Sequence, residues 1–547
     1  MSKKQKDRIV SRRDFLKKGA AVGVGATALA ALSPDVKASQ IRFDREADVV
    51  VVGAGVSGLA AAIHAVDRGA SLIVVDSNFD IGGHGMLSGG NVVLGGGTSM
   101  QKKYNIQDSA DQIFLDHTRP DHSLARYNDR DVVRAFADNN LATFDFLIAN
   151  GVQFPDKPPA LSETATVPRQ QTTIVAPGGL SVSINDRPGS GLVRALEASA
   201  RKKGVEILLL HKMTSIVRES PTSGRVLGIT ATVQGNTRNI QAKKAVIIAT
   251  GGHSGNVDFR RIFDPRLTEE YQHAGEPYTN QNADGENAAL AIGASLWGTA
   301  NQTNEGGRAI TKTLHIGCRH GYRNLKWKPE SPVFKRAGAA GLTVKDWQDV
   351  ILVNLMGLRF WNEVDDSYDF FAACLGSVVL DGGKARAGGP IWAIFDSDAV
   401  KREDWVSTPP NVDPNGYFFS GDTLAELTGK LVNNPYQKRP MPRSALQETV
   451  TRYNSFVDAG KDADFNKPTP KYKIQTPPFY AGWATPILHD TLAGLRVNEK
   501  YQVVDRQAQV IPGLYCAGES ASGFAMHGLA KGLVSGYIAG REAALET

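Results

Sequence analysis

The sequence predicts an α/β fold with a Rossmann-like sheet. Residues 49–52 are four consecutive valines, a run typical of a strand buried in a parallel sheet. Gly53, Gly55 and Gly58 follow in G-x-G-x-x-G spacing, and an alanine-rich segment with helical periodicity comes next. A second apolar run, residues 71–75, ends at Asp76. Strand, glycine turn, helix and second strand therefore follow one another as in a βαβ unit.

The first 38 residues have the order of a twin-arginine export signal. Arg12 and Arg13 lie in a basic stretch that leads into an uncharged run of 16 residues, 19–34. That run is shorter than the roughly 20 residues of a membrane-spanning helix, and small residues at 36 and 38 mark a cleavage site. The alternative is a disordered basic tail. We expect a protein exported folded by the Tat machinery to the periplasm or another extracytoplasmic space.

The charge of the chain is concentrated in this leader. The whole chain carries a formal net charge of +6, and residues 1–38 hold nine lysines and arginines and three aspartates. The remaining chain is therefore close to neutral, and its charge gives no reason to expect a nucleic-acid partner. About 509 residues remain, which predicts two domains. No later segment is apolar enough to predict a membrane span.

Cysteine usage limits the redox chemistry of the chain. Cys318, Cys374 and Cys516 are its three cysteines, and none lies in a C-x-x-C or C-x-x-C-H motif. This argues against a c-type haem and against a redox-active dithiol. An oxidising compartment would permit one disulfide among them.

The glycine turn predicts a dinucleotide site. Gly53 permits the tight turn, Gly55 lets a pyrophosphate approach the backbone, and Gly58 lets helix and strand pack closely. The helix N-terminus presents free N–H groups to the phosphates. Asp76 lies about 20 residues further on, where a carboxylate accepts hydrogen bonds from ribose hydroxyls. A glycine-rich turn without a ligand is the alternative.

A second glycine-rich stretch directly follows Asp76. Residues 82–97 contain eight glycines in 16 positions, several of them paired. Such a backbone can lie flat against a planar ring system, although a surface loop would have the same composition. This stretch therefore favours a dinucleotide with a flat ring.

Four later segments resemble a known family, the flavoprotein subunits of fumarate reductase and succinate dehydrogenase, with their relatives the 3-ketosteroid dehydrogenases and urocanate reductases. The segments are AVIIATGGHSGN (245–256), NADGENAALAIGA (282–294), HDTLAGLRVNEKYQVVD (489–505) and IPGLYCAGESASG (511–523). The resemblance implies FAD as cofactor. His84 stands one residue away from the histidine that carries the flavin in succinate dehydrogenases, so we expect non-covalent FAD.

The resemblance also implies which residues hold FAD and how the domains are arranged. The expected cofactor residues are Gly53, Gly55, Ser57, Gly58, Asp76, Gly82, Gly83, Ser88, Gly89, Gly90, Thr250, Gly251, Asp284, Gly518, Glu519, Leu533 and Val534. Residues 41–298 and 486–547 would form a discontinuous FAD-binding domain, and residues 299–485 an inserted α+β capping domain. The terminal helix, about 528–545, would direct its N-terminus at the pyrimidine end of the flavin.

His489 is the best candidate for the reaction itself. A flavin exchanges a hydride with a carbon next to a carbonyl or carboxylate, so the chain has to hold that group and bear its developing charge. In the resembling reductases the position of His489 donates to the substrate, and Thr491 also matches the segment. A buried histidine satisfied by backbone is the alternative.

Three departures from the family exclude a C4-dicarboxylate as the substrate. The stretch GLRFWNE, residues 357–363, is present, but Ser367 stands where fumarate reductases have a catalytic arginine. The His-Pro that binds a carboxylate ahead of the cap is missing from the sequence, and Lys531 stands in place of a further arginine. One cation would not hold two carboxylates.

Two tyrosines are candidates for the proton donor. Tyr368 lies beside the vacated position and Tyr480 lies shortly before His489, although either ring is equally consistent with core packing. A cluster in residues 306–329 includes a candidate substrate ligand, Arg308, and is otherwise consistent with a solvated face. The members of this cluster are Arg308, His315, Arg319, His320, Tyr322 and Arg323. We expect no metal, because the histidines have no acidic partner in ligand spacing.

Together these features predict an exported FAD-dependent oxidoreductase acting on CH–CH groups. Its substrate would be a small molecule, a ketone, enone or aromatic or steroid-like acid, and a separate protein would donate or accept the electrons. A 3-ketosteroid-type dehydrogenase and a non-catalytic flavin-binding partner protein are the alternatives. The sequence leaves open the direction of the reaction.

Overall fold

The computed structural model describes most of the chain after the leader. The described residues are 41–122, 125–162, 165–176, 187–298, 310–322, 325–366, 370–379, 385–387 and 389–547. The predicted export signal, residues 1–38, lies outside them, as do Tyr368 and Arg308. The chain divides into Met1–Ile41 and a compact unit, Arg42–Thr547.

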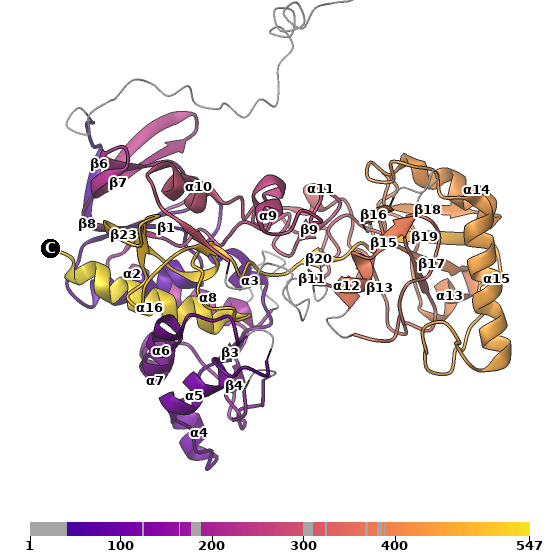
Figure 1. Cartoon of the computed structure of the whole chain (residues 1–547), viewed down its shortest axis with the longest axis horizontal. Coiled ribbons are helices and arrows are strands. Elements are labelled where there is room, and N and C mark those ends of the chain that lie inside the picture. The colour runs from indigo at the N-terminus through magenta and orange to yellow at the C-terminus, as the bar shows by residue number, and fades with distance from the viewer. Residues whose placement is uncertain are drawn as a thin grey trace, which may run out of the picture. The chain divides into compact units, whose positions relative to one another are not determined.

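An eight-stranded sheet organises the first part of this unit (Figure 1). Its strands are β1 (Arg45–Val52), β2 (Leu72–Val75), β5 (Glu206–Leu208), β6 (Lys212–Ser220), β7 (Ser223–Val233), β8 (Asn236–Ile248), β22 (Gln502–Val504) and β23 (Val510–Cys516). The order β23-β8-β1-β2-β5 is parallel throughout, while β22, β6 and β7 pair antiparallel. The valine run lies in β1 between two neighbours and is buried. This confirms the predicted α/β fold.

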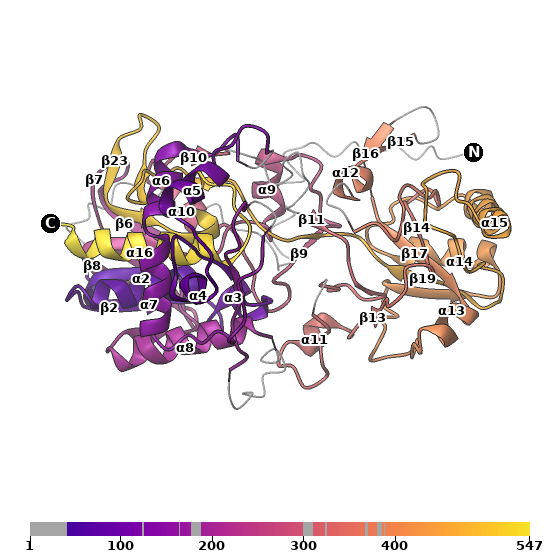
Figure 2. The same cartoon turned by 90° about the horizontal axis from the view of Figure 1, so that it is seen from below.

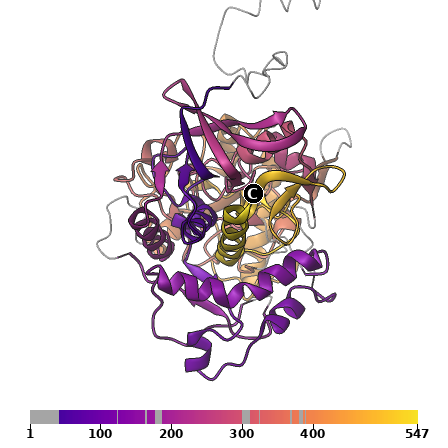
Figure 3. The same cartoon turned by 90° about the vertical axis from the view of Figure 1, so that its left-hand side faces the viewer.

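Three helices form a layer against this sheet, as Figure 3 shows. They are α2 (Val56–Val66), α8 (Gly189–Lys202) and α16 (Leu529–Leu545). Glycines let α16 lie directly on α2, because a Cβ at Gly536 would be 2.2 Å from Ser57 O and one at Gly540 would be 2.2 Å from Ala61 O. The final helix is thus packed beside the first βαβ unit.

A mainly helical segment follows the glycine-rich stretch. It consists of β3 (Asn91–Val93), α4 (Ser99–Lys103), α5 (Ala110–Asp116), α6 (Arg130–Asp138), α7 (Asn140–Ala149) and β4 (Gln170–Thr172), with β3 and β4 paired. Arg169 joins its parts, since its guanidinium binds Asp108 at 2.8 Å and Asp116 at 2.6 Å, and all three side chains are buried.

A four-stranded antiparallel sheet organises the second part of the unit (Figure 2). Its order is β14 (Ile351–Val353), β17 (Trp392–Asp396), β19 (Phe479–Trp483) and β18 (Phe418–Gly421). Alternate residues of these strands enter two separate cores, one on each face. The helices α13 (Ser397–Arg402), α14 (Leu424–Lys430) and α15 (Arg443–Ala459) flank the sheet.

The remaining short elements lie outside the two large sheets. They are α3 (Gly83–Leu87), α9 (Val257–Phe263), β9 (Gln272–His273), α10 (Asp284–Ala291), β10 (Leu296–Trp297), β11 (Ile310–Thr311), β12 (His315–Ile316), α11 (Phe334–Ala337), β13 (Leu342–Thr343), α12 (Phe370–Cys374), β15 (Ser377–Val379), β16 (Ala385–Ala387), η3 (Leu431–Asn433), β20 (Ile487–Leu488), β21 (Gly494–Leu495) and η4 (Gly518–Ser520). β20 pairs with β9 and β11 and ends immediately before His489. This small sheet therefore fixes the backbone at the best catalytic candidate.

The chain returns to its first sheet at the C-terminus. β22, β23 and α16 join the sheet that begins with β1. The boundaries predicted at residues 298 and 485 stay a prediction. All three cysteines are buried and free, and among the described residues no helix combines the length and apolarity needed to cross a bilayer.

Candidate active site

A large cavity lies at the carboxyl ends of the parallel strands. Its volume is about 580 Å³, and Val52, Val75 and Ala249, at or just beyond the ends of β1, β2 and β8, line it. In open α/β sheets this edge is where ligands bind. The cavity therefore lies where the sequence predicts the dinucleotide.

The three glycines of the turn have different steric surroundings. Gly53 has φ +110°, and a Cβ there would be 2.2 Å from Ala249 O. A Cβ at Gly58 would be 1.9 Å from Gly53 O. A Cβ at Gly55 meets no protein atom nearer than Gly82 O at 4.0 Å, although Gly55 lines the cavity. Gly53 and Gly58 are thus required by the fold, whereas Gly55 leaves space for a ligand.

Asp76 holds the turn at the end of β2. Its Oδ2 accepts from Ala54 N at 2.7 Å and its Oδ1 accepts from Asn78 N at 2.8 Å. Burial raises the pKa of Asp76. Each carboxylate oxygen has a second lone pair, so the residue can still accept from a ribose hydroxyl.

Glu519, which also lines the cavity, is held in place by a buried glutamine. Gln281 Nε2 donates to Glu519 Oε2 at 3.1 Å and to Gly251 O at 2.6 Å. His84, from α3, approaches Glu519 Oε1 at 3.7 Å. The 250–252 turn and the 518–519 turn are therefore tied together at the cavity.

The N-terminus of α16 opens into the cavity. Gly528, Leu529, Lys531 and Gly532 line it, and no side chain caps the helix. Lys531 is buried, and its Nζ has no hydrogen-bond partner among the described residues. Burial lowers the pKa of Lys531 to about 8. A buried amine without a partner at an uncapped helix N-terminus is suited to an anionic group.

These features fit the predicted FAD. The open space at Gly55 suits a pyrophosphate beside the N-terminus of α2, and Asp76 suits a ribose. The orphaned amine of Lys531 and the N-terminus of α16 suit the electron-rich end of a flavin.

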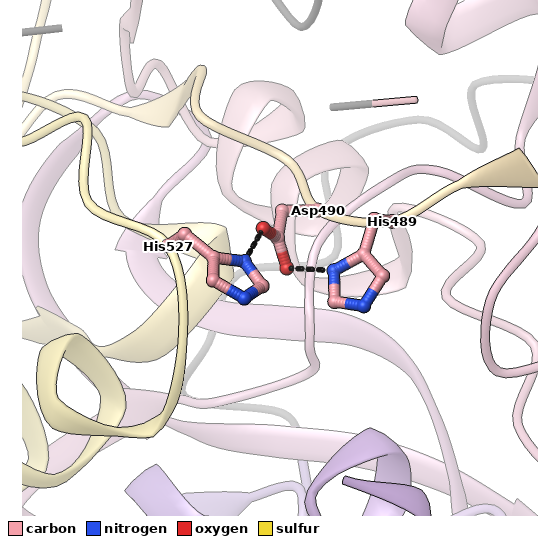
Figure 4. Close-up of side chains that lie close together, drawn as sticks. All are labelled: His489, Asp490 and His527. Atoms are coloured by element: carbon pink, nitrogen blue, oxygen red, sulfur yellow. Dashed lines mark hydrogen bonds and ion pairs between the residues drawn. The ribbon is translucent and has the colours of Figure 1, made fainter. Parts of the chain in front are cut away.

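A polar cluster made of Tyr322, His489, Asp490 and His527 lines the same cavity. Figure 4 shows the last three pointing toward one another. His489 Nδ1 lies 3.1 Å from Asp490 Oδ1, and His527 Nδ1 is bonded to Asp490 Oδ2. On its other side, His489 Nε2 lies 2.9 Å from the Tyr322 hydroxyl. Both ring nitrogens of His489 are thus engaged.

The charges of this cluster follow from its burial. Burial lowers the pKa of His489, and Asp490 opposes that effect. Burial would raise the pKa of Asp490, but His527 and then His489 outweigh it and hold that pKa well below its ordinary value. Asp490 is therefore a carboxylate between two imidazoles. One nitrogen or carboxylate oxygen from each of His489, Asp490 and His527 lies within 4.8 Å of the others, a spacing at which they could hold a metal ion. The sequence analysis did not consider these three residues together, and its expectation of no metal stays a prediction.

Most of the predicted cofactor residues line the cavity. Those that do are Gly53, Gly55, Ser57, Asp76, Gly82, Gly83, Ser88, Gly89, Thr250, Gly251, Asp284, Gly518 and Glu519. The predicted cofactor residues that do not line it are Gly58, Gly90, Leu533 and Val534. Leu533 and Val534 belong to the core under α16, and Gly58 packs α2 against the turn. Their contribution is to the fold around the cavity.

Two predicted catalytic or substrate residues lie away from the cavity. Tyr480 stacks on Phe395 with ring centroids 5.3 Å apart and contacts Phe418, all in the second sheet. Thr491 is buried, and its hydroxyl donates to Glu519 O at 3.1 Å. The structure thus packs the half-buried Tyr480 against a core of the second sheet, and gives Thr491 a role in positioning Glu519.

Sequence reasoning did not single out His527, and it placed Tyr322 only in a cluster of possible substrate ligands rather than beside His489. Tyr322 stood in the basic and aromatic run before residue 330, and His527 stood four positions before Lys531. Neither lies near His489 in sequence, so only the fold brings them together. Of the residues that the sequence predicted for catalysis or substrate binding, His489 and Lys531 line the cavity.

Comparison with known proteins agrees with this geometry. The family model described as FAD binding domain matches residues 48–532. The fumarate reductase (cytochrome) of Shewanella frigidimarina is 29% identical over 91% of this chain and 77% of its own. The urocanate reductase of Eggerthella lenta is 27% identical over 87% of this chain and 70% of its own.

Two solved structures share the fold. The open conformation of a flavocytochrome c3 fumarate reductase matches with a TM-score of 0.63 and 23% identity, over 92% of this chain and 79% of that one. The 3-ketosteroid-Δ4-(5α)-dehydrogenase of Rhodococcus jostii RHA1 matches with a TM-score of 0.57 and 24% identity, over 93% and 99%.

Proposed function

The chain belongs to the FAD binding domain family, and from that premise we propose a more specific activity for it. It is an FAD-dependent oxidoreductase acting on CH–CH groups. We propose that it is exported and exchanges a hydride at a C–C bond activated by a carbonyl or carboxylate. In this proposal the natural substrate is not a C4-dicarboxylate but a ketone, an enone, or an aromatic or steroid-like acid.

The pair of Tyr322 and His489 carries this proposal. Their 2.9 Å contact lies in the same cavity as the glycine turn. Burial lowers the pKa of His489, so the pair is neutral and presents the Tyr322 hydroxyl rather than a formal charge to the substrate. A neutral pair suits a carbonyl or phenol oxygen better than two carboxylates.

The chain has residues for each part of the cofactor. FAD, when bound, supplies or takes the hydride. The turn from Gly53 to Ser57 would hold the pyrophosphate, and Asp76 the ribose. Glu519 would hold the ribityl chain, and Lys531 with the N-terminus of α16 the electron-rich end of the flavin. What is left for the cluster around His489 is the substrate.

Two alternatives follow from the same cavity. A 3-ketosteroid-type dehydrogenase would run the reaction toward the unsaturated product, with the same neutral pair at the ketone. A non-catalytic flavin-binding partner protein would keep FAD without turnover, and Ser367 in place of an arginine favours it. The two differ in whether a small molecule changes the redox state of the bound flavin.

Anaerobic flavin absorbance of the purified protein tests the proposal. We expect an enone or unsaturated aromatic acid to reoxidise the reduced flavin, or a saturated ketone or steroid to bleach the oxidised flavin. Fumarate and succinate serve as the matched dicarboxylate controls and are expected to react at least about 100-fold more slowly, since loss of charged contacts is worth several kcal/mol. Fumarate as the fastest oxidant would overturn the substrate assignment. Silence from both panels would favour the non-catalytic alternative.

The export route has its own test. Replacing Arg12 and Arg13 together by lysine should retain the protein in the cytoplasm with FAD bound, because the twin-arginine pair is what the export machinery reads. Cell fractionation with flavin fluorescence measures the distribution. Equal amounts of both forms outside the cytoplasm would contradict the proposed route.

A further inference from the structure

The hydrogen-bonded cluster at the cavity has the connectivity of a proton relay. We propose that Tyr322 exchanges the proton with the substrate carbon, that His489 takes or returns the proton of Tyr322, and that Asp490 and His527 balance the charge on His489. This inference rests on the proposed function, because it assigns the second half of the same CH–CH reaction. Tyr322 takes the role of proton donor that the sequence favoured for Tyr368 or Tyr480.

The directions of the hydrogen bonds follow from Asp490. Asp490 is charged, and a carboxylate only accepts hydrogen bonds. His489 therefore carries its proton on Nδ1 and donates it to Asp490 Oδ1. The Nε2 atom of a neutral imidazole is then an acceptor. The Tyr322 hydroxyl accordingly donates to His489 Nε2, at 2.9 Å.

This arrangement makes Tyr322 the group that faces the substrate. Both nitrogens of His489 are engaged, one by Asp490 and one by Tyr322. Tyr322 lines the cavity, and only 4% of the residue is exposed. The order hydroxyl, imidazole, carboxylate has the logic of a catalytic triad, in which the imidazole takes the hydroxyl proton and the carboxylate stabilises the imidazolium.

The proton step balances in both directions. In dehydrogenation the substrate C–H bond breaks, its proton goes to the Tyr322 oxygen, and the Tyr322 proton passes to His489 Nε2. The hydride leaves to the oxidised flavin, so the substrate loses two electrons. In reduction His489 begins as the imidazolium. A hydride from the reduced flavin reaches one carbon, the phenol proton of Tyr322 forms the C–H bond at the other carbon, and His489 returns its proton to the Tyr322 oxygen. The positive charge on His489, which forms in dehydrogenation and is lost in reduction, lies against Asp490 in each direction.

His527 balances the charge of the cluster at the boundary of the cavity. Its Nδ1 binds the second oxygen of Asp490, and its side chain is 43% exposed, whereas Asp490 is 8% exposed. An imidazole at the boundary of the cavity can exchange protons with water. The carboxylate couples the two imidazoles, so a proton gained by His489 favours loss of one from His527.

Lys531 is the rival proton donor in the cavity. It is buried, and its pKa is lowered to about 8 by burial. It has no hydrogen bond to the cluster or to any other described residue, so nothing in the described chain would return a proton to it after it reacted. The relay favours Tyr322 for that reason, and a Lys531→Met variant separates the two.

The decisive measurement compares Tyr322→Phe with a matched control. We expect Tyr322→Phe to keep its FAD and to react with the substrate found in the flavin assay about 10²–10⁴-fold more slowly, the usual contribution of a general acid or base. Tyr104→Phe removes a hydroxyl outside the cavity that donates to Asp156 and should react at the wild-type rate. The assignment would be overturned if Tyr322→Phe reacted at the full rate while Lys531→Met reacted about 10²–10⁴-fold more slowly.

Two further readouts test the relay behind Tyr322. His527→Ala should be slowed, and added imidazole should restore part of the rate, because the lost side chain is exposed. In histidine-selective ¹⁵N NMR of the FAD-loaded protein, His489, identified by its absence in His489→Asn, should show the proton on Nδ1. Its Nε2 signal should move in Tyr322→Phe. A proton on Nε2 of His489, or an Nε2 signal unchanged in Tyr322→Phe, would overturn the relay even if no substrate is found. If the flavin of the wild-type protein responds to no compound, that result alone counts against the proposed function.

Discussion

A Gly55→Val variant is expected to purify as a folded protein without FAD. The valine side chain would enter the cavity, since the nearest protein atom to its Cβ is Gly82 O at 4.0 Å. The fold is therefore not disturbed, but the space that a pyrophosphate needs beside the N-terminus of α2 is filled. Flavin absorbance per polypeptide measures the loss, and circular dichroism measures the fold.

Two other glycines provide the controls for this prediction. Gly429→Val, where an added Cβ meets nothing within 4 Å, should keep full FAD content. Gly58→Val should fail to fold, because its Cβ would lie 1.9 Å from Gly53 O. Full FAD content in Gly55→Val would mean that the cofactor does not approach this turn, and the assignment of the cavity would be wrong.

The sequence predicts the first βαβ unit well because its signals are local. The valine run, the glycine spacing and Asp76 lie within about 30 residues, and β1, α2 and β2 form there. The predicted strand at residues 49–52 proves to be the end of a longer one, Arg45–Val52, because pairing with β8 extends beyond the buried part. The predictions of FAD and of the reaction class are also confirmed. They could be made from the sequence because the motifs that carry them are continuous in it.

The cluster around His489 is less predictable because its contacts are distant in sequence. Tyr322 and His489 are 167 positions apart, and Asp490 and His527 are 37 apart. Tyr480 is closer to His489 in sequence than Tyr322, yet its half-buried ring packs against a core of the second sheet. Distance along the chain is therefore a poor guide to which aromatic residue reaches the cavity.

The stretch GLRFWNE shows that a matching segment can have a structural role. Arg359 donates to both oxygens of Glu363 at 2.8 Å and to Asp462 Oδ2 at 3.0 Å. Lys467 Nζ lies 3.3 Å from Glu363, and all four side chains are buried. The charged residues of this segment therefore hold the second sheet to α15 and the loop after it, whatever stands at position 367.

An Arg359→Leu variant is expected to lose about 3–5 kcal/mol of stability in the second part of the unit, the usual cost of breaking a buried ion pair. The substitution leaves Glu363 and Asp462 buried with Lys467 as their remaining cation in the described structure. Denaturant unfolding followed by fluorescence of the buried Trp392 and Trp483 reports on this part. Arg452→Leu is the matched control, because Arg452 is 62% exposed in its pair with Asp464, and such pairs contribute at most about 1 kcal/mol.

The pH dependence of the Arg359→Leu effect identifies its cause. Burial raises the pKa of Glu363, but the attraction of Lys467 and the hydrogen bonds from Arg359 outweigh it, and the pKa is lowered. A carboxylate with a lowered folded pKa stabilises the fold above its unfolded pKa, about 4.3 for glutamate, and loses that contribution as pH falls through the folded value. The difference between wild type and Arg359→Leu should therefore be full at pH 7 and shrink below about pH 4. A difference that is constant down to pH 3 would assign the loss to packing of the arginine side chain rather than to its charge.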